Sequence, residues 1–332
     1  MKHITEVLKI INAASCRDWP KVASWAEQLV VKLELAGETP SANRVRRLLV
    51  RSGSRFQSIG NGTSSHMMPV GSDGRCQLLD EETFDETNTP VVCLEQKVKG
   101  TVEQFIRYVE ARDLLISRGV GISPSLIMDG PPGCGKTELG RWVAARLGLP
   151  LLTARIDGLI SSYLGNTAKH VRQIFDHAMA RPCVLFLDEF DGLAKMRDDR
   201  NEVGELKRTV VSVLQCIDAL DGQTVMLAAT NHEHLLDPAV WRRFAYHVRI
   251  ELPSEAVRAQ LLGLFLGDFA GALAVAHLAA ASAGLNGGVL RQVCDDCKRD
   301  AVIDGRTEID LAVAGERVRQ AQSQIRDAAK GG

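Results

Sequence analysis

Short apolar runs alternate with longer amphipathic stretches along the middle of this chain. Residues 125–128, 183–187 and 225–229 are short and largely apolar, which is typical of strands buried on both faces of a parallel sheet. The stretches between them, such as residues 167–180, place apolar side chains at helical spacing. Strands that alternate with helices in this way predict a doubly wound α/β domain.

The pattern changes after Pro253, where helical periodicity continues without an intervening strand. The predicted helices span residues 254–267, 271–283, 287–303 and 308–327. We therefore expect an αβα sandwich with a parallel sheet at residues 89–252, followed by a small α-helical domain at residues 253–330.

The N-terminal part of the chain differs from both of these regions. Residues 1–51 carry amphipathic helical patterns and predict a small helical module. Residues 52–88 include a stretch rich in Gly, Ser, Asn and Thr and predict a flexible linker. A module of about fifty residues cannot bury much apolar surface alone, so we expect it to dock on the same assembly or on a partner.

Composition narrows the setting of the protein. The 332 residues contain 40 Lys and Arg against 41 Asp and Glu, which argues against a broadly basic surface for nucleic acid or membrane. No run approaches the roughly 18 apolar residues of a membrane span. Glu6 and Lys9 interrupt the apolar stretch that a signal peptide would need, and the eight cysteines form no disulfide framework. We expect a cytoplasmic protein without membrane contact.

A glycine-rich segment joins the strand at residues 125–128 to the helix that begins near Lys136. It fits the pattern G-x-x-x-x-G-K-[ST], in which backbone N–H groups and the helix N-terminus surround phosphate oxygens. Lys136 is expected to reach the β- and γ-phosphates of ATP, and the Thr137 hydroxyl to bind Mg²⁺. The predicted nucleotide-binding residues are Gly130, Pro131, Pro132, Gly133, Cys134, Gly135, Lys136, Thr137 and Glu138.

Two further strands end in polar side chains that suit ATP hydrolysis. Asp188 follows the apolar run at residues 183–187 and can hold hydrated Mg²⁺, while Glu189 can orient and deprotonate the attacking water. Asn231 ends the run at residues 225–229, and its amide would reach the γ-phosphate or the water if the two strands are neighbours. The bland alternative for the acidic pair is a solvated turn.

Two adjacent arginines, Arg242 and Arg243, precede the last predicted strand. We expect them to point outward, towards the nucleotide of a neighbouring subunit. An arginine supplied in this way stabilises the charge that develops during phosphoryl transfer. The alternative is a pair of surface arginines at the end of a helix.

These features, in this order, resemble the AAA+ ATPases over about residues 90–325. Residues 130–137 match Walker A, residues 185–189 match Walker B, and Asn231 matches sensor 1. The resemblance implies a P-loop NTPase sandwich with a helical lid, ATP and Mg²⁺ as cofactors, and hydrolysis between the subunits of a homo-oligomeric ring, usually a hexamer.

Some positions match the family less closely. The segment before Phe244 is shorter than the common form, so Arg243 fits the arginine-finger position better than Arg242. Arg291 lies where some relatives carry a sensor 2 arginine that touches phosphate, and many close relatives have none.

The triplet Tyr163-Leu164-Gly165 resembles the first pore loop of ring translocases. A tyrosine there can grip many side chains without demanding one sequence, although a core tyrosine is the alternative. The implied function is remodelling or translocation of a protein substrate. Residues 159–165, 202–208 and 229–238 also resemble bacterial AAA proteins that accompany subtilisin-like serine proteases. This resemblance implies a protease partner and a role in defence. The chain itself has no recognisable serine-protease triad, so any proteolysis would come from another protein.

Two other functions stay open at this point. The first is a nucleotide-gated regulator that controls a partner through residues 1–51 without threading a substrate. The second is a DNA-dependent motor, against which the near-neutral charge and the lack of an aromatic and basic stripe count.

Overall fold

The computed structural model describes most of the chain beyond residue 78. The chain separates into two compact units, Met1–Met68 and Pro69–Gly332. The residues described in the second unit are 79–85, 88–155, 167–192, 203–220 and 224–330. In the first unit only Lys32 is described, and it lies in a helix. The helical module predicted at residues 1–51 therefore stays a prediction.

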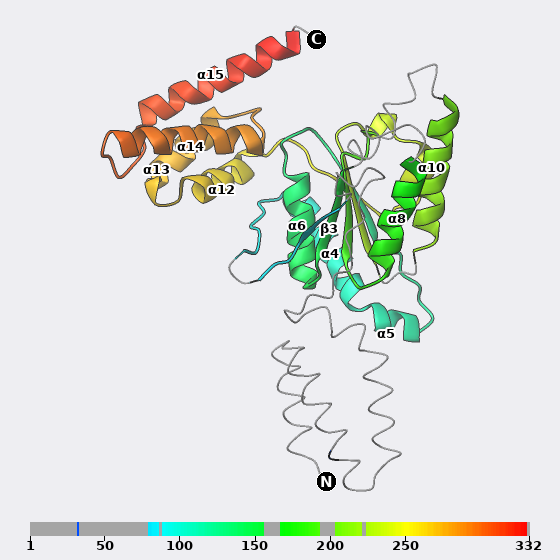
Figure 1. Cartoon of the computed structure of the whole chain (residues 1–332). Coiled ribbons are helices and arrows are strands. Elements are labelled where there is room, and N and C mark those ends of the chain that lie inside the picture. The colour runs from blue at the N-terminus through cyan, green and yellow to red at the C-terminus, as the bar shows by residue number, and fades with distance from the viewer. Residues whose placement is uncertain are drawn as a thin grey trace. The chain divides into compact units, whose positions relative to one another are not determined.

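The strands of the described residues form one six-stranded sheet in the order β1-β3-β4-β5-β2-β6 (Figure 1). The strands are β1 Asp80–Glu82, β2 Ser125–Asp129, β3 Leu151–Arg155, β4 Val184–Asp188, β5 Val225–Thr230 and β6 Tyr246–Arg249. Every neighbouring pair is parallel except β1 with β3, which is antiparallel. The predicted α/β fold with a mainly parallel sheet is confirmed.

Helices cover both faces of this sheet, so its central strands are buried on both sides. The helices around the sheet are α4 Gln96–Glu110, α5 Arg112–Ser117, α6 Lys136–Leu147, α8 Thr167–Met179, α10 Val203–Asp218 and α11 Pro238–Trp241. Figure 1 shows α6 on one side and α8 with α10 on the other. Leu126 and Met128 of β2 and Phe186 of β4 share one core with α4 and α6. Double coverage explains the continuous apolar runs in the sequence.

Two elements differ from the sequence expectation. Strand β1 lies inside residues 52–88, the predicted linker. The sequence pattern did not indicate it, because its three residues are all acidic and give no apolar alternation. It is held by pairing with β3, by the ion pair between Glu81 and Arg181 (2.6 Å), and by the buried side chain of Leu79. The amphipathic pattern of residues 95–118 predicts one helix before the phosphate loop, but the structure has two, since the backbone leaves helical geometry at Ala111 (φ −84°, ψ 7°).

The C-terminal helices form a separate apolar core, in agreement with the sequence pattern. They are α12 Glu255–Leu266, α13 Ala272–Ala281, α14 Gly287–Ile303 and α15 Leu311–Lys330, with a 3-10 turn at Gly267–Phe269. Side chains cap α12 and α14: Ser254 accepts from the N–H of Val257, and Asn286 accepts from the N–H of Val289. None of the helices in the described part of the chain has the length and apolar character of a membrane span.

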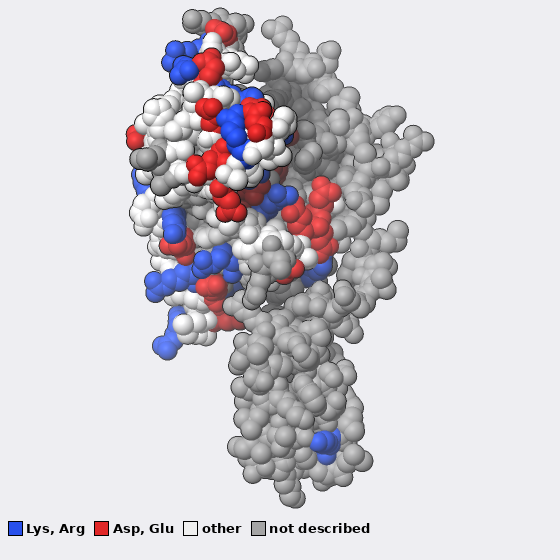
Figure 2. Space-filling model, turned by 90° about the vertical axis from the view of Figure 1, so that its left-hand side faces the viewer, with Lys and Arg blue, Asp and Glu red and all other residues white. Residues whose placement is uncertain are grey.

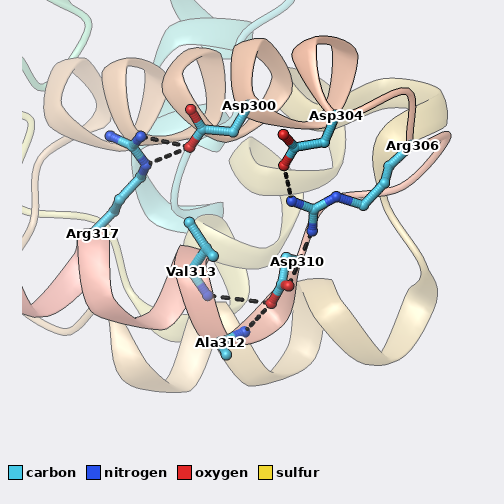
Figure 3. Close-up of polar contacts among 7 residues, drawn as sticks. All are labelled: Asp300, Asp304, Arg306, Asp310, Ala312, Val313 and Arg317. Carbon is cyan, nitrogen blue, oxygen red and sulfur yellow. Dashed lines mark hydrogen bonds and ion pairs between the residues drawn. The ribbon is translucent and has the colours of Figure 1, made fainter.

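Charged side chains fix the turn between α14 and α15 (Figure 3). Arg306 in the turn contacts both Asp304 and Asp310. Asp310 also accepts hydrogen bonds from two backbone N–H groups at the start of α15. Arg317 reaches back from α15 to Asp300 on α14. Exposed ion pairs stabilise a fold little one by one, so their main effect here is to define the path of the turn.

Candidate active site

The predicted phosphate loop joins β2 to α6, and its glycines adopt conformations that other residues rarely take. The φ angles of Gly130, Gly133 and Gly135 are 144°, 74° and 93°. At Gly130 a Cβ atom would also lie only 2.0 Å from the backbone oxygen of Ile250 on the neighbouring chain segment. The loop can therefore fold in this shape only with glycine at these positions.

Lys136 is the first residue of α6 and lies at the centre of this loop. Its Nζ donates to the carbonyl oxygens of Gly130 (2.7 Å) and Pro131 (2.9 Å), and the residue is buried. Burial lowers the pKa of the Lys136 ammonium, and the nearby carboxylate of Asp188 opposes this shift. An anion in the loop would meet this ammonium together with the positive end of α6.

Thr137 and Asp188 come together although 51 residues separate them. The Thr137 Oγ1 donates to Asp188 Oδ2 at 2.9 Å. Asp188 is the last residue of β4, so its carboxylate lies at the carboxyl edge of the sheet beside the start of α6. Hydroxyl and carboxylate oxygens are ligands that Mg²⁺ prefers, so these two side chains fit the predicted metal site.

Glu189 occupies a strained turn directly after β4. Its φ of 52° is the only positive φ at a non-glycine position among the described residues. The turn is held by the N–H of Glu189, which donates to Asp188 Oδ1 (2.9 Å), and by the N–H of Phe190, which donates to the oxygen of Ala229 (2.8 Å). Such strain costs of the order of 1–3 kcal/mol and often occurs at functional positions.

Asn231 follows β5, and β5 lies between β4 and β2, the neighbour relation that the sequence analysis required. The loop is fixed by Asp191, which accepts from the N–H of Asn231 (3.1 Å) and from Thr230 Oγ1 (3.3 Å). Asp191 is 1% exposed. The sequence analysis missed this residue, although a third acid, three positions after Asp188, was a usable signal.

These groups surround one cavity of about 450 Å³, a volume suited to a nucleotide. Lys136, Thr137, Asp188, Glu189 and Asn231 line its polar part. Its apolar part is formed by two segments. Val91 and Leu94 come from the segment before α4, and Leu261 and Phe265 come from the lid helix α12. Arg291 of α14 also lines the cavity, and its guanidinium lies over the Phe265 ring, 4.8 Å from the centroid.

The two predicted finger arginines lie away from this cavity, and neither lines it. Arg243 forms a two-pronged pair with Asp218 at the end of α10 (2.8 and 2.9 Å) and donates to the oxygen of Ala239 (2.8 Å). The backbone oxygen of Arg243 accepts from the Oγ of Ser125, the first residue of β2. The phosphate loop follows the other end of β2, about 13 Å away along a five-residue strand. Arg242 is exposed.

The predicted pore-loop residues Tyr163, Leu164 and Gly165 lie outside the described residues. The chain is described up to Arg155 at the end of β3 and again from Thr167 at the start of α8. The substrate-binding role of this segment therefore stays a prediction.

An ionic group at the base of the phosphate loop was also absent from the sequence analysis. Asp129, the residue before Gly130, contacts Arg249 of β6 (3.3 Å), which also pairs with Glu233 (2.5 Å) just after Asn231. The pKa of Asp129 is raised to about 6, first by burial and then by the neighbouring Glu233, while the charges of Arg249 and Lys136 oppose the shift. The group links the phosphate loop to the loop that carries Asn231.

We predict that ionisation of Asp129 weakens nucleotide binding. Because its pKa is raised to about 6, Asp129 is neutral at pH 5 and charged at pH 7.5, where it adds a negative charge beside Lys136. The Asp129→Asn variant should bind ATP like the wild type at pH 5 and about 3- to 10-fold more tightly at pH 7.5. Titration with a fluorescent ATP analogue measures the affinity of each protein at each pH. The ionisation of ATP itself cancels in the ratio of variant to wild-type affinity. If this ratio is the same at pH 5 and pH 7.5, the prediction is wrong.

Known proteins resemble this chain in both sequence and fold. Residues 126–252 match the profile of the ATPase family associated with various cellular activities (AAA). The chain is 33% identical over 307 residues to the uncharacterised AAA family ATPase y4kL of Sinorhizobium fredii, which covers 92% of this chain and 91% of that protein. The AAA domain of FIGL-1 shares the fold, with a TM-score of 0.61 and 23% identity over 75% of this chain and 90% of that domain.

Two longer proteins match part of the chain. The ATP-dependent zinc metalloprotease FtsH 1 of Symbiobacterium thermophilum is 32% identical over 234 residues, which are 67% of this chain and 39% of that protein. The 26S proteasome regulatory subunit 6A of Saccharomyces cerevisiae is 33% identical over 203 residues, 59% of this chain and 47% of that subunit. The chain thus spans less than half of either protein. Family profile, full-length relative and fold agree, and the chain belongs to the AAA family of ATPases.

Proposed function

We propose that this ATPase forms a homo-oligomeric ring, expected to be a hexamer, and that Arg243 of one subunit completes the ATP site of the next. The observation that carries the proposal is the position of Arg243 at the end of β2 opposite the phosphate loop. About 13 Å of strand separates it from its own nucleotide site, so a nucleotide that it contacts belongs to another subunit. Arg242, exposed beside it, is a second candidate.

Within one site the proposed roles follow from chemistry and position. Lys136 binds the β- and γ-phosphates, and the loop N–H groups surround them. Thr137 and Asp188 hold Mg²⁺, which neutralises phosphate charge when it is bound. Glu189 takes the proton of the attacking water, and Asn231 orients that water or the γ-phosphate. Arg291, which lines the cavity from the lid, is proposed as an additional phosphate contact.

We propose a protein as the substrate of the ring. Two of the relatives are named as an ATP-dependent protease and a proteasome regulatory subunit. Basic and acidic side chains are interspersed on the described part of the surface shown in Figure 2, which favours neither DNA nor RNA as the substrate. The triplet at residues 163–165 would contact the polypeptide. A subtilisin-like protease partner and a role in defence rest on the sequence resemblance alone.

Replacing Tyr163 with alanine tests the protein-remodelling function. Basal ATP hydrolysis should stay within about twofold of the wild type, because the proposed role of Tyr163 is to contact the substrate and not the nucleotide. Stimulation of hydrolysis by unfolded, carboxymethylated casein should fall at least about tenfold, since the variant lacks the aromatic side chain that is proposed to contact the substrate polypeptide. Tyr163→Phe, which keeps the aromatic side chain, serves as the control. Casein stimulation that survives in Tyr163→Ala would instead favour the nucleotide-gated regulator.

A further inference from the structure

The lid domain contacts the phosphate loop directly through the start of α14. The Asn286 Nδ2 donates to the backbone oxygen of Pro132 (3.0 Å). Two residues later, the N–H of Gly288 donates to the backbone oxygen of Gly133 (3.0 Å). Both acceptors belong to the predicted phosphate loop, so the lid helix α14 is hydrogen-bonded directly to that loop.

With these contacts, four consecutive carbonyl groups of the loop are all hydrogen-bonded. Lys136 binds the first two, those of Gly130 and Pro131, and the lid binds the next two, those of Pro132 and Gly133. If Lys136 turns towards bound phosphate, the lid contacts remain to hold the loop in its curled shape. The carbonyl groups then point away from the anion, and the N–H groups towards it.

The two polar atoms of the Asn286 side chain make different contacts. Its Oδ1 accepts from the N–H of Val289 (2.9 Å) and caps α14, while its Nδ2 reaches the loop. The fit is close, because a Cβ atom on Gly133 would lie 2.7 Å from that Nδ2. A shorter capping residue such as serine can preserve the first contact and lose the second.

We propose that Asn286 is a positioning residue of the ATPase site, whose amide joins the lid to the phosphate loop so that the two move together. It acts through the loop and does not need to touch the nucleotide. The role requires only that ATP binds at residues 130–137 and is independent of ring formation. Nucleotide binding at the loop is then transmitted to α14, and the lid position in turn sets the affinity of the loop.

The test compares full-length wild type with Asn286→Ser, which keeps the cap and the charge but removes the contact with Pro132. Affinity for fluorescent ADP should fall about 5- to 10-fold, the effect expected for one hydrogen bond that holds a binding loop. In hydrogen exchange, ADP should protect both the phosphate loop and the first turn of α14 in the wild type. In Asn286→Ser it should protect the loop only.

A second variant separates this role from simple stability of the lid. In Gly287→Ala the new Cβ would lie 3.3 Å from the oxygen of Gly133, a tight contact that requires the lid and the loop to separate by a few tenths of an ångström. Alanine also favours the helix by up to about 1 kcal/mol over glycine. We therefore expect a lid that is at least as stable but a weaker affinity for ADP.

Ser254→Ala is the matched control, because it removes the cap of α12, another lid helix, without touching the loop. It should lower thermal stability and leave ADP affinity unchanged. The proposal is overturned if Asn286→Ser keeps wild-type affinity and exchange, or if Ser254→Ala weakens ADP binding to the same extent.

Discussion

Replacing Arg243 with alanine is expected to lower ATP turnover of the assembled protein by about 10³-fold or more, the range seen for arginines supplied in trans. Affinity for ADP should change little, because Arg243 lies outside the cavity of its own subunit. Steady-state hydrolysis and equilibrium binding measure the two quantities. Arg306→Ala is the control, since Arg306 is another arginine paired with aspartate but lies in the lid. Turnover that Arg243→Ala leaves unchanged would remove the finger from the mechanism.

Mixing two inactive variants tests whether Arg243 acts across subunits. An Arg243→Ala subunit keeps its own Glu189, and a Glu189→Gln subunit keeps its own Arg243. An equal mixture should restore activity at about a quarter of the contacts, those in which a complete site forms from two different subunits. An arginine that served its own subunit would give no recovery at any mixing ratio.

The Glu189→Gln variant is expected to bind ATP with nearly unchanged affinity and to hydrolyse it about 10²- to 10⁴-fold more slowly. Glutamine has the same shape as glutamate but cannot take a proton from water. Single-turnover hydrolysis of radiolabelled ATP separates the chemical step from product release. Because the variant retains ATP, we expect it to accumulate the proposed oligomer, which size-exclusion chromatography with ATP would show.

The matched control is Glu251→Gln, which removes a carboxylate that lines the same cavity but is exposed and paired with Arg249. It should keep turnover within a few-fold of the wild type. Equal losses in Glu251→Gln and Glu189→Gln would mean that negative charge in the cavity matters, and that no general base has been identified at residue 189.

Much of the fold and the centre of the site follow from local sequence pattern. Largely apolar runs of four or five residues identify β2, β4 and β5, and the polar residue after each run identifies where the strand ends. Since the carboxyl ends of parallel strands share one edge, the approach of Thr137 to Asp188 could be expected. The order of strands, with β5 between β4 and β2, then brings Asn231 to the same cavity.

The remaining features depend on contacts between polar residues far apart in the chain. Nothing near Asp129 in the sequence indicates that Arg249 will lie beside it, and Asn286 reads locally as an ordinary helix cap. Strand β1 has no apolar pattern, and its place at the edge of the sheet is set by backbone pairing with β3, which the sequence pattern does not report. Periodicity reports burial, so it cannot reveal a hydrogen-bond partner that lies 100 or more residues away.

The short strand β2 has a consequence for any ring that the subunits form. One end of β2 leads into the phosphate loop, and the other end, through Ser125, holds the backbone of Arg243. The strand is thus a fixed spacer between the part of a subunit that receives an arginine and the part that supplies one. Inserting a single residue into it would exchange the two faces of the strand and shift one of these parts against the other. The length of β2 should therefore tolerate less change than that of the loops around it.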